Sequence, residues 1–256
     1  MLIAQLSDLH ICRANDSVFG GVDSAQSLIQ CVQAVNALRP QPDFVVLSGD
    51  LVNTGHPDEY IRLQSILERL NARYYLMPGN HDDRELLLAA FPGADYFPRQ
   101  PPFSYAVEDF PVRLVCLDQV APGDTGGDFT PEAARWLDQT LAQAPEKPTL
   151  LALHHPPFAS HDLLFDRIGM KHAEAFAAVI ARHSQVARIV CGHHHRAVFG
   201  QVAHAPCVIA PSTSWTYGLA LHQDQRLAPV SSEAPGWMLH VWTLQSGFAS
   251  HVMGLR

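Results

Sequence analysis

Five short apolar segments of the chain are each followed by side chains that can bind a metal ion. The segments are LIAQL (2–6), FVVLS (44–48), YYLM (74–77), TLLAL (149–153) and ARIVC (187–191). Short runs that are rich in branched or aromatic apolar side chains predict buried β-strands. In α/β sheets, ligands bind beyond the carboxyl ends of the strands, so the five segments are expected to deliver their polar residues to one edge.

Helical patterns alternate with these strands. One apolar face begins after a capping residue at Asp23 or Ser24 and ends before Pro40. Further helices are predicted to begin at Pro57, to run from Pro131 to Leu141 and to span Met170 to His183. This alternation predicts an α/β architecture in the first half of the chain.

More closely spaced strand candidates occupy residues 100–120 and 197–256. They favour mixed sheets, of the α+β kind, in a two-sheet arrangement over one purely parallel sheet. We find no repeat, low-complexity segment or linker, so residues 1–256 are expected to form a single domain.

The candidate ligands fall into five sets, one behind each strand. They are Asp8 and His10, Asp50, Asn80 and His81, His154 and His155, and His193 to His195. A single Asp-x-His or His-His pair is more often a surface turn than a metal site, but five sets at the same end of predicted strands favour a metal site. In an extended chain residues i and i+2 face the same side, which predicts that Leu9 and His194 point away.

The chemistry of the set narrows the choice of metal. Carboxylates, imidazoles and one amide, without a thiolate, favour Fe, Mn, Zn or Co over a cysteine-held site, and the set is too rich in nitrogen for Ca or Mg alone. Seven candidates exceed what one ion can use. Two ions that share a bridging carboxylate would accommodate them.

Five motifs together resemble those of the calcineurin-like metallophosphoesterases. They are DLH at 8–10, GDLVNTG at 49–55, GNHD at 79–82, HHPP at 154–157 and GHHH at 192–195. Within that superfamily the chain resembles the class III cyclic-nucleotide phosphodiesterases and the glycerophosphodiesterases. The resemblance implies a four-layer αββα sandwich over the whole chain, with residues from about 200 to 256 as a β-rich extension for oligomerisation.

The resemblance also implies a division of the ligands between two ions. Asp8, His10, Asp50 and His195 would hold one ion, and Asp50, Asn80, His154 and His193 would hold the other. Asp50 would bridge the two. Asn80, His81 and His195 would contact the substrate, with His81 stabilising or protonating the leaving oxygen. A hydroxide would attack phosphorus in line, without a covalent enzyme intermediate.

Three sequence details bear on the substrate. Protein Ser/Thr phosphatases have Asp-Arg where this chain has Asn53-Thr54, and the missing arginine favours diesters. Close relatives often carry a histidine near Trp215, which is expected either to pack in the core or to stack on a nucleobase. Every ligand position is filled, which disfavours a non-catalytic scaffold. The candidate substrates are 3′,5′-cyclic nucleotides such as cAMP and, as the alternative, glycerophosphodiesters.

Composition limits the partners and the compartment. Lys and Arg number 17 against 25 Asp and Glu, and the net charge of −8 disfavours a dedicated nucleic-acid binder. The five cysteines show no CxxC spacing, and no leader or long apolar run is present, so a cytoplasmic protein without membrane attachment is expected. The resemblance implies a homo-oligomer, a dimer or higher.

Overall fold

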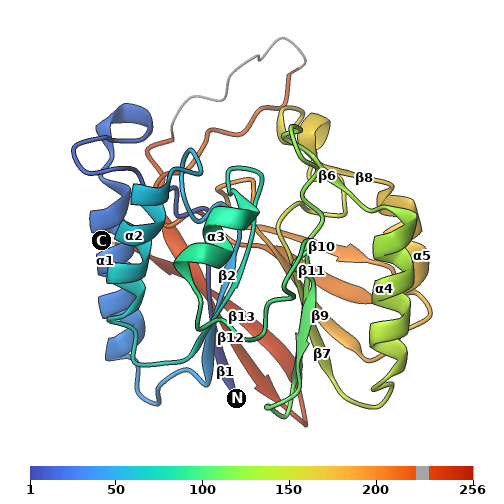
Figure 1. The fold of residues 1–256 in the computed structure, drawn as a ribbon. Coiled ribbons are helices and arrows are strands. Elements are labelled where there is room, and N and C mark those ends of the chain that lie inside the picture. Colours follow the sequence, from blue (N-terminus) through green and yellow to red (C-terminus); the bar gives the residue numbers. More distant parts are fainter. Residues whose placement is uncertain (223–230, 256) are drawn as a thin grey trace.

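Two mixed β-sheets pack face to face and carry helices on both outer faces (Figure 1). The structure is a computed structural model that describes residues 1–222 and 231–255. Residues 223–230 of the predicted extension therefore lie outside the described part. The predicted α/β sandwich with mixed sheets is confirmed.

The first sheet has the strand order β13-β12-β1-β2-β3. Its strands are β1 (Leu2–Leu6), β2 (Phe44–Ser48), β3 (Tyr74–Met77), β12 (Gly236–Thr243) and β13 (Gly247–Gly254). β1, β2 and β3 run parallel, whereas β12 is antiparallel to β1 and to β13. The C-terminal hairpin thus completes the sheet that the N-terminal strand begins.

The second sheet has the order β10-β11-β9-β7-β5-β4. Its strands are β4 (Tyr105–Val107), β5 (Arg113–Leu117), β7 (Thr149–Leu153), β9 (Val186–Cys191), β10 (Val198–Val202) and β11 (Ala205–Ile209). The four inner strands are parallel and both edge strands are antiparallel to their neighbours. A separate pair joins β6 (Gly127–Asp128) to β8 (Met170–Lys171).

The helices cover the outer faces. They are α1 (Ser24–Ala37), α2 (Pro57–Leu67), α3 (Arg84–Ala90), α4 (Pro131–Ala142) and α5 (Ala173–Ile180), with short 3₁₀ turns η1 (Phe19–Gly21) and η2 (Phe165–Ile168). Asp23 caps α1 and Thr130 caps α4 through side-chain oxygens that accept backbone N–H groups. None of the helices in the described ranges is long and apolar enough to cross a membrane.

The prediction of a helix from Met170 to His183 was wrong at both ends. Met170 and Lys171 form β8, and α5 covers only Ala173–Ile180. β8 pairs with β6, which lies more than 40 residues away in the chain. A contact of that range overrides the local apolar pattern, which by itself suits a helix. α3 was not predicted from the sequence.

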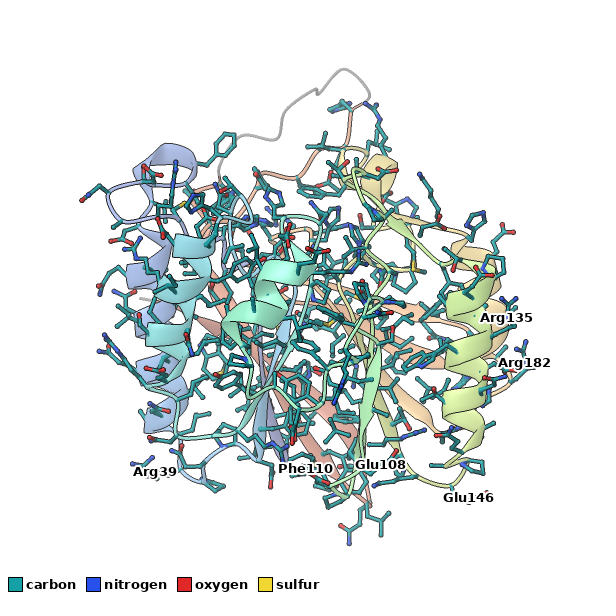
Figure 2. All side chains as sticks on the ribbon, in the orientation of Figure 1. Arg39, Glu108, Phe110, Arg135, Glu146 and Arg182 are labelled. Carbon is teal, nitrogen blue, oxygen red and sulfur yellow. The ribbon has the colours of Figure 1, made fainter. Side chains whose placement is uncertain are left out.

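The inner faces of the two sheets form one continuous core, filled by side chains of both layers (Figure 2). At the upper end of Figure 1 the loops behind the parallel strands meet. The backbone N–H of Asp8 donates to the Gly49 carbonyl at 3.1 Å within the first sheet. Between the sheets, the backbone N–H of His193, behind β9, donates to Asp8 Oδ1, behind β1, at 2.9 Å. The carboxyl ends of strands from both sheets therefore form a single edge.

Candidate metal centre

The ligand loops have sharply turned backbones. Asp8, His10, Asp50, His193 and His195 all adopt positive φ angles, between 45° and 75°. Such angles cost non-glycine residues about 1–3 kcal/mol each and tend to persist at functional sites. The chain here is therefore not extended, and the i, i+2 argument from strand geometry does not describe these loops.

Glycines allow the loops to pack this closely. A Cβ atom at Gly49 would collide with the His154 ring, and one at Gly79 would collide with the Asp50 carboxylate. Gly49 also has a φ of 90°. These two positions require glycine because backbone and ligand side chains occupy the space of a side chain.

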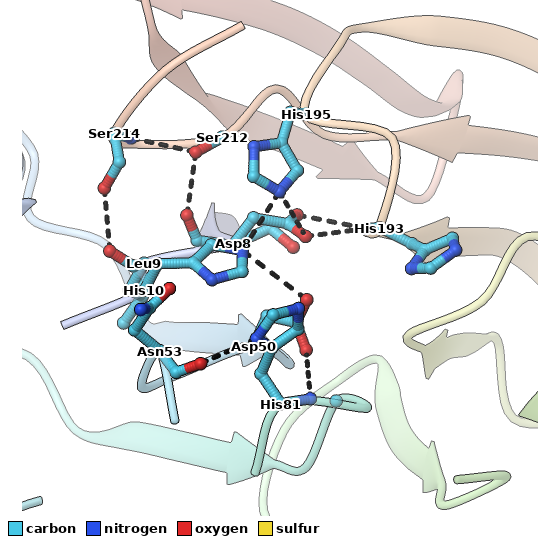
Figure 3. A network of polar contacts seen from close by, with 12 residues as sticks. Asp8, Leu9, His10, Asp50, Asn53, His81, His193, His195, Ser212 and Ser214 are labelled. Carbon is cyan, nitrogen blue, oxygen red and sulfur yellow. Dashed lines mark hydrogen bonds and ion pairs between the residues drawn. The ribbon is translucent and has the colours of Figure 1, made fainter. Parts of the chain in front are cut away.

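Four predicted ligands converge on one point (Figure 3). His10 Nε2 lies 3.0 Å from His195 Nε2 and 3.5 Å from Asp50 Oδ2, and His195 Nε2 lies 3.6 Å from Asp8 Oδ1. Ligand atoms about 2.0–2.2 Å from one ion are separated by about 2.8–3.1 Å at the right angles of an octahedral site and by about 3.3–3.6 Å at tetrahedral angles. The spacing of these nitrogen and oxygen atoms therefore fits a shared cation.

A second group lies next to the first. It comprises His154, His155 and His193, whose ligand atoms lie within 4.8 Å of one another. His154 Nε2 is 3.3 Å from Asp50 Oδ1, so Asp50 reaches both groups through its two oxygens. Asn80 lines the same cavity, and its Oδ1 is buried without a hydrogen-bond partner. An unpartnered amide oxygen beside imidazoles and a carboxylate fits a second cation.

Backbone carbonyls orient three of the imidazoles. His154 Nδ1 donates to Ser48 O at 2.8 Å, His195 Nδ1 donates to Trp215 O at 3.2 Å, and His193 Nε2 donates to Ile168 O at 3.1 Å. Each bond fixes the ring and leaves its other nitrogen free as a lone-pair donor. Metal-binding histidines typically have such a partner.

Burial keeps several imidazoles neutral. It lowers the pKa of His10 to about 3 and holds the pKa values of His193 and His195 well below the usual range. A neutral imidazole is the form that binds a metal ion.

Burial and neighbouring charges shift the pKa values of the charged groups in the site. Burial by itself would lower the pKa of His154, but the adjacent Asp50 carboxylate raises it to about 9. Burial raises the pKa of Asp8 to about 7. Removed from water, these carboxylates need positive charge nearby, which a bound cation would supply.

The two histidines that lie next to predicted ligands, His155 and His194, differ in their placement. His155 belongs to the second ligand group, since its ring centroid is 4.5 Å from that of His193 and its Nδ1 is buried without a partner. His194 is buried outside both ligand groups, with its ring against Phe165 at 4.8 Å.

His81 is exposed at the cavity wall. Its backbone N–H donates to Asp50 Oδ1 at 3.0 Å, and its Nδ1 donates to the Asn53 carbonyl at 2.7 Å (Figure 3). The ring is thus oriented beside the first ligand group, with its centroid 4.6 Å from that of His10. Nε2 is left available to a substrate.

The ligand groups form the floor of a cavity of about 480 Å³. Its walls include four aromatic side chains, Phe19, Phe165, Trp215 and Tyr217. Trp215 is 4% exposed, and its ring packs against those of His10 and His195 with centroids 4.7 and 4.4 Å away. Trp215 therefore both packs and lines the cavity, which the sequence left as alternatives.

Two serines that sequence reasoning missed support the first ligand loop. Ser212 Oγ donates to the Asp8 carbonyl and Ser214 Oγ donates to the Leu9 carbonyl, both at 2.7 Å (Figure 3). Both follow β11 in the segment PSTSW. A cluster of small hydroxyl side chains directly behind a strand was the signal that would have found them.

Known proteins are similar to this chain in sequence. The model of the calcineurin-like phosphoesterase family matches residues 1–197. A probable glycerophosphodiester phosphodiesterase of Arcobacter nitrofigilis is 32% identical over 98% of this chain and 92% of its own length. A 3′,5′-cyclic-nucleotide phosphodiesterase of Nostoc is 27% identical over 93% of this chain and 86% of its own length.

A solved structure has a similar fold. It is a dimetal phosphatase from Danio rerio, with a TM-score of 0.72 and 16% identity, over 99% of this chain and 96% of that one. At this identity the similarity concerns the fold alone.

Proposed function

Since the chain belongs to the calcineurin-like phosphoesterase family, we propose that it is a metal-dependent enzyme that hydrolyses small phosphodiesters. The observation that carries the proposal is the convergence of two ligand groups, joined through Asp50, on the floor of one cavity. Two metal sites that share a ligand are typical of enzymes that displace groups from phosphorus.

Two ions, of Fe, Mn, Zn or Co, would be divided as the resemblance implies. Asp8, His10, Asp50 and His195 would hold the first, and Asp50, Asn80, His154 and His193 would hold the second. When bound, the ions neutralise phosphate oxygens and lower the pKa of a water from about 15.7 toward about 7.

The other side chains position the substrate and supply a proton. The Asn80 amide and the His81 ring contact the phosphate, and His195 lies at the same wall. The Asn53 carbonyl accepts from His81 Nδ1, so Nε2 is the free nitrogen, and it can donate a proton to the leaving oxygen when the ring carries its second proton.

The cavity favours diesters over monoesters. None of its lining residues in the described ranges is lysine or arginine. A monoester dianion would therefore find no side-chain cation beside its second negative charge, whereas a diester carries a single charge.

The aromatic wall favours cyclic nucleotides among the diesters. Phe19 is 57% exposed at the cavity wall, and its ring is roughly parallel to that of Trp215, 29° apart with centroids 6.4 Å apart. Tyr217 and Phe165 extend the wall, with centroids 5.5 Å apart. A planar base gains contact on such a surface, which a flexible glycerol group does not.

Glycerophosphodiesters remain the second candidate, and the relatives include enzymes named for each of the two activities. The Arcobacter protein matches nearly the whole chain and is named for the glycerophosphodiesterase activity. A kcat/KM comparison for cAMP, 2′,3′-cAMP and glycerophosphoethanolamine on one metal-reconstituted preparation separates the candidates. We expect cAMP to be preferred.

Phe19→Ala tests the aromatic wall. Stacking is worth about 1–3 kcal/mol per base, so kcat/KM for cAMP should fall by about fivefold to 150-fold while that for glycerophosphoethanolamine stays the same. Phe199→Ala is the matched control, because Phe199 is 60% exposed on β10 and does not line the cavity. An equal loss on both substrates would reject the wall as a determinant of specificity.

The proposal also includes a cytoplasmic location, a single-domain organisation and a homo-oligomeric assembly. The five cysteines are free and buried, which suits a reducing cytoplasm. The chain would act as a single domain, whose C-terminal β-rich part, including the edge strand β13, forms contacts in a homo-oligomer. Light scattering on the purified protein would test this, and a monomeric mass would reject the oligomer.

A further inference from the structure

A buried glutamine joins the two sheets directly behind the metal centre. Gln5, in β1, is 0% exposed. Its Nε2 donates to Ser48 Oγ at 2.9 Å and to the Cys191 carbonyl at 2.8 Å, and its Oε1 accepts from His240 Nε2 at 3.0 Å. The partners belong to β2, β9 and β12, so one side chain links three strands of two sheets.

The contacts of Gln5 lie at the points where two strands enter the ligand loops. Asp50 follows Ser48 by two residues, and His193 follows Cys191 by two residues. The Ser48 carbonyl also accepts the hydrogen bond from His154 Nδ1 at 2.8 Å. Gln5 therefore contacts the two residues, Ser48 and Cys191, from which the chain leads to Asp50 and His193, and Ser48 itself orients His154.

The network continues away from the site to the C-terminal hairpin. His240 Nδ1 accepts from Ser250 Oγ of β13 at 2.8 Å. Because Gln5 donates through both N–H bonds, its oxygen must accept, and this fixes the proton of His240 on Nε2. The orientation of the Gln5 amide is thus set from behind by the two strands of the hairpin.

Packing alone does not explain why a buried position in β1 is occupied by glutamine. An amide buried among apolar neighbours is unfavourable unless it is hydrogen-bonded, and an apolar side chain would fill the same volume without that requirement. A fully bonded network inside the core instead holds its members in one arrangement. Here the arrangement determines how the ends of β2 and β9 face each other.

We propose that Gln5, held in place by His240, is a positioning residue for the second metal ion. This rests on the proposed two-ion site. The first ion depends less on Gln5, because its ligands Asp8 and His10 lie in a loop whose carbonyls at Asp8 and Leu9 accept hydrogen bonds from Ser212 and Ser214.

Metal binding, measured without activity, tests the proposal. Full-length protein is stripped of metal and titrated with Co²⁺ by calorimetry, with the visible absorption of bound Co²⁺ recorded in parallel. Asn80→Ala identifies the binding event of the second ion in these titrations. In Gln5→Leu we expect the second ion to bind about 10–100-fold more weakly, with the first ion weakened by clearly less.

Two further variants separate positioning from stability. Val45→Ala creates a cavity in the neighbouring strand β2, at a residue that is also 0% exposed and whose register partners, Ala4 and Tyr74, lie outside the network. It should lower Tm and leave both ions bound as in the wild type. His240→Leu removes the support of the Gln5 oxygen and should weaken the second ion by less than Gln5→Leu does, and it provides the test if Gln5→Leu does not fold.

The outcomes are distinct. Equal weakening of both ions, or a loss of the second ion in Val45→Ala comparable to that in Gln5→Leu, would overturn the positioning role. Wild-type binding of the second ion in Gln5→Leu would overturn it as well. A wild-type protein that binds fewer than two ions would instead contradict the proposed function itself.

Discussion

Replacing Asp50 by alanine is expected to remove bound metal and nearly all hydrolytic activity. Asp50 reaches His10 Nε2 with one carboxylate oxygen and His154 Nε2 with the other, at 3.5 and 3.3 Å. No other carboxylate of the described ligand groups spans both. Losing transition-state stabilisation of several kcal/mol should slow turnover by at least about 10³-fold.

Elemental analysis and hydrolysis of bis(p-nitrophenyl) phosphate would measure both effects on the same preparation. Asp58→Ala is the control for the loss of an aspartate, because Asp58 lies exposed in the first turn of α2, away from the ligand groups. An Asp50→Ala protein that kept two ions per chain and normal turnover would refute the assignment of the bridging ligand.

His81→Ala is expected to keep the metal ions and to slow turnover by about 10²–10⁴-fold, the range typical of general acid–base catalysis. His81 contacts the ligand Asp50 through its backbone N–H, which alanine retains. Only the ring, oriented by the Asn53 carbonyl, is lost. The effect should therefore concern the proton of the leaving group and not the binding of metal.

The leaving group provides the diagnostic comparison for His81. An alkoxide needs protonation more than nitrophenolate does, so His81→Ala should impair alkyl diesters more than nitrophenyl diesters. His204→Ala, which removes an exposed histidine between β10 and β11, should affect neither. Equal slowing of both substrate classes would argue that His81 acts by binding phosphate and does not donate a proton.

The strands and the ligand loops could be predicted because their signals are local. Each apolar run is about as long as one buried strand, and glycine marks the turn behind β2 and β9. The pairing of Asp8 with His10 was also predicted, but for a reason the structure does not support. Both residues have positive φ angles, so the loops turn sharply and do not continue as extended chain.

Other features depend on contacts between distant parts of the chain. The local sequence pattern at Met170 favours a helix, but the pairing of β8 with β6 places this residue in a strand. Phe19, Phe165 and Tyr217 are far apart in the sequence, and only the fold brings them to one cavity wall. Gln5 is a polar residue within an apolar strand. Its structural role depends on hydrogen-bond partners that lie 43, 186 and 235 residues away in the sequence.

The central claim is that two ions at one carboxylate-linked site perform the hydrolysis. The most direct measurement is a titration of metal-free protein with Mn²⁺ or Co²⁺, in which bound metal and the hydrolysis of bis(p-nitrophenyl) phosphate are followed together. We predict that turnover stays low while one ion per chain is bound and reaches its plateau at two. Full turnover without metal, or a plateau at one ion per chain, would contradict the account.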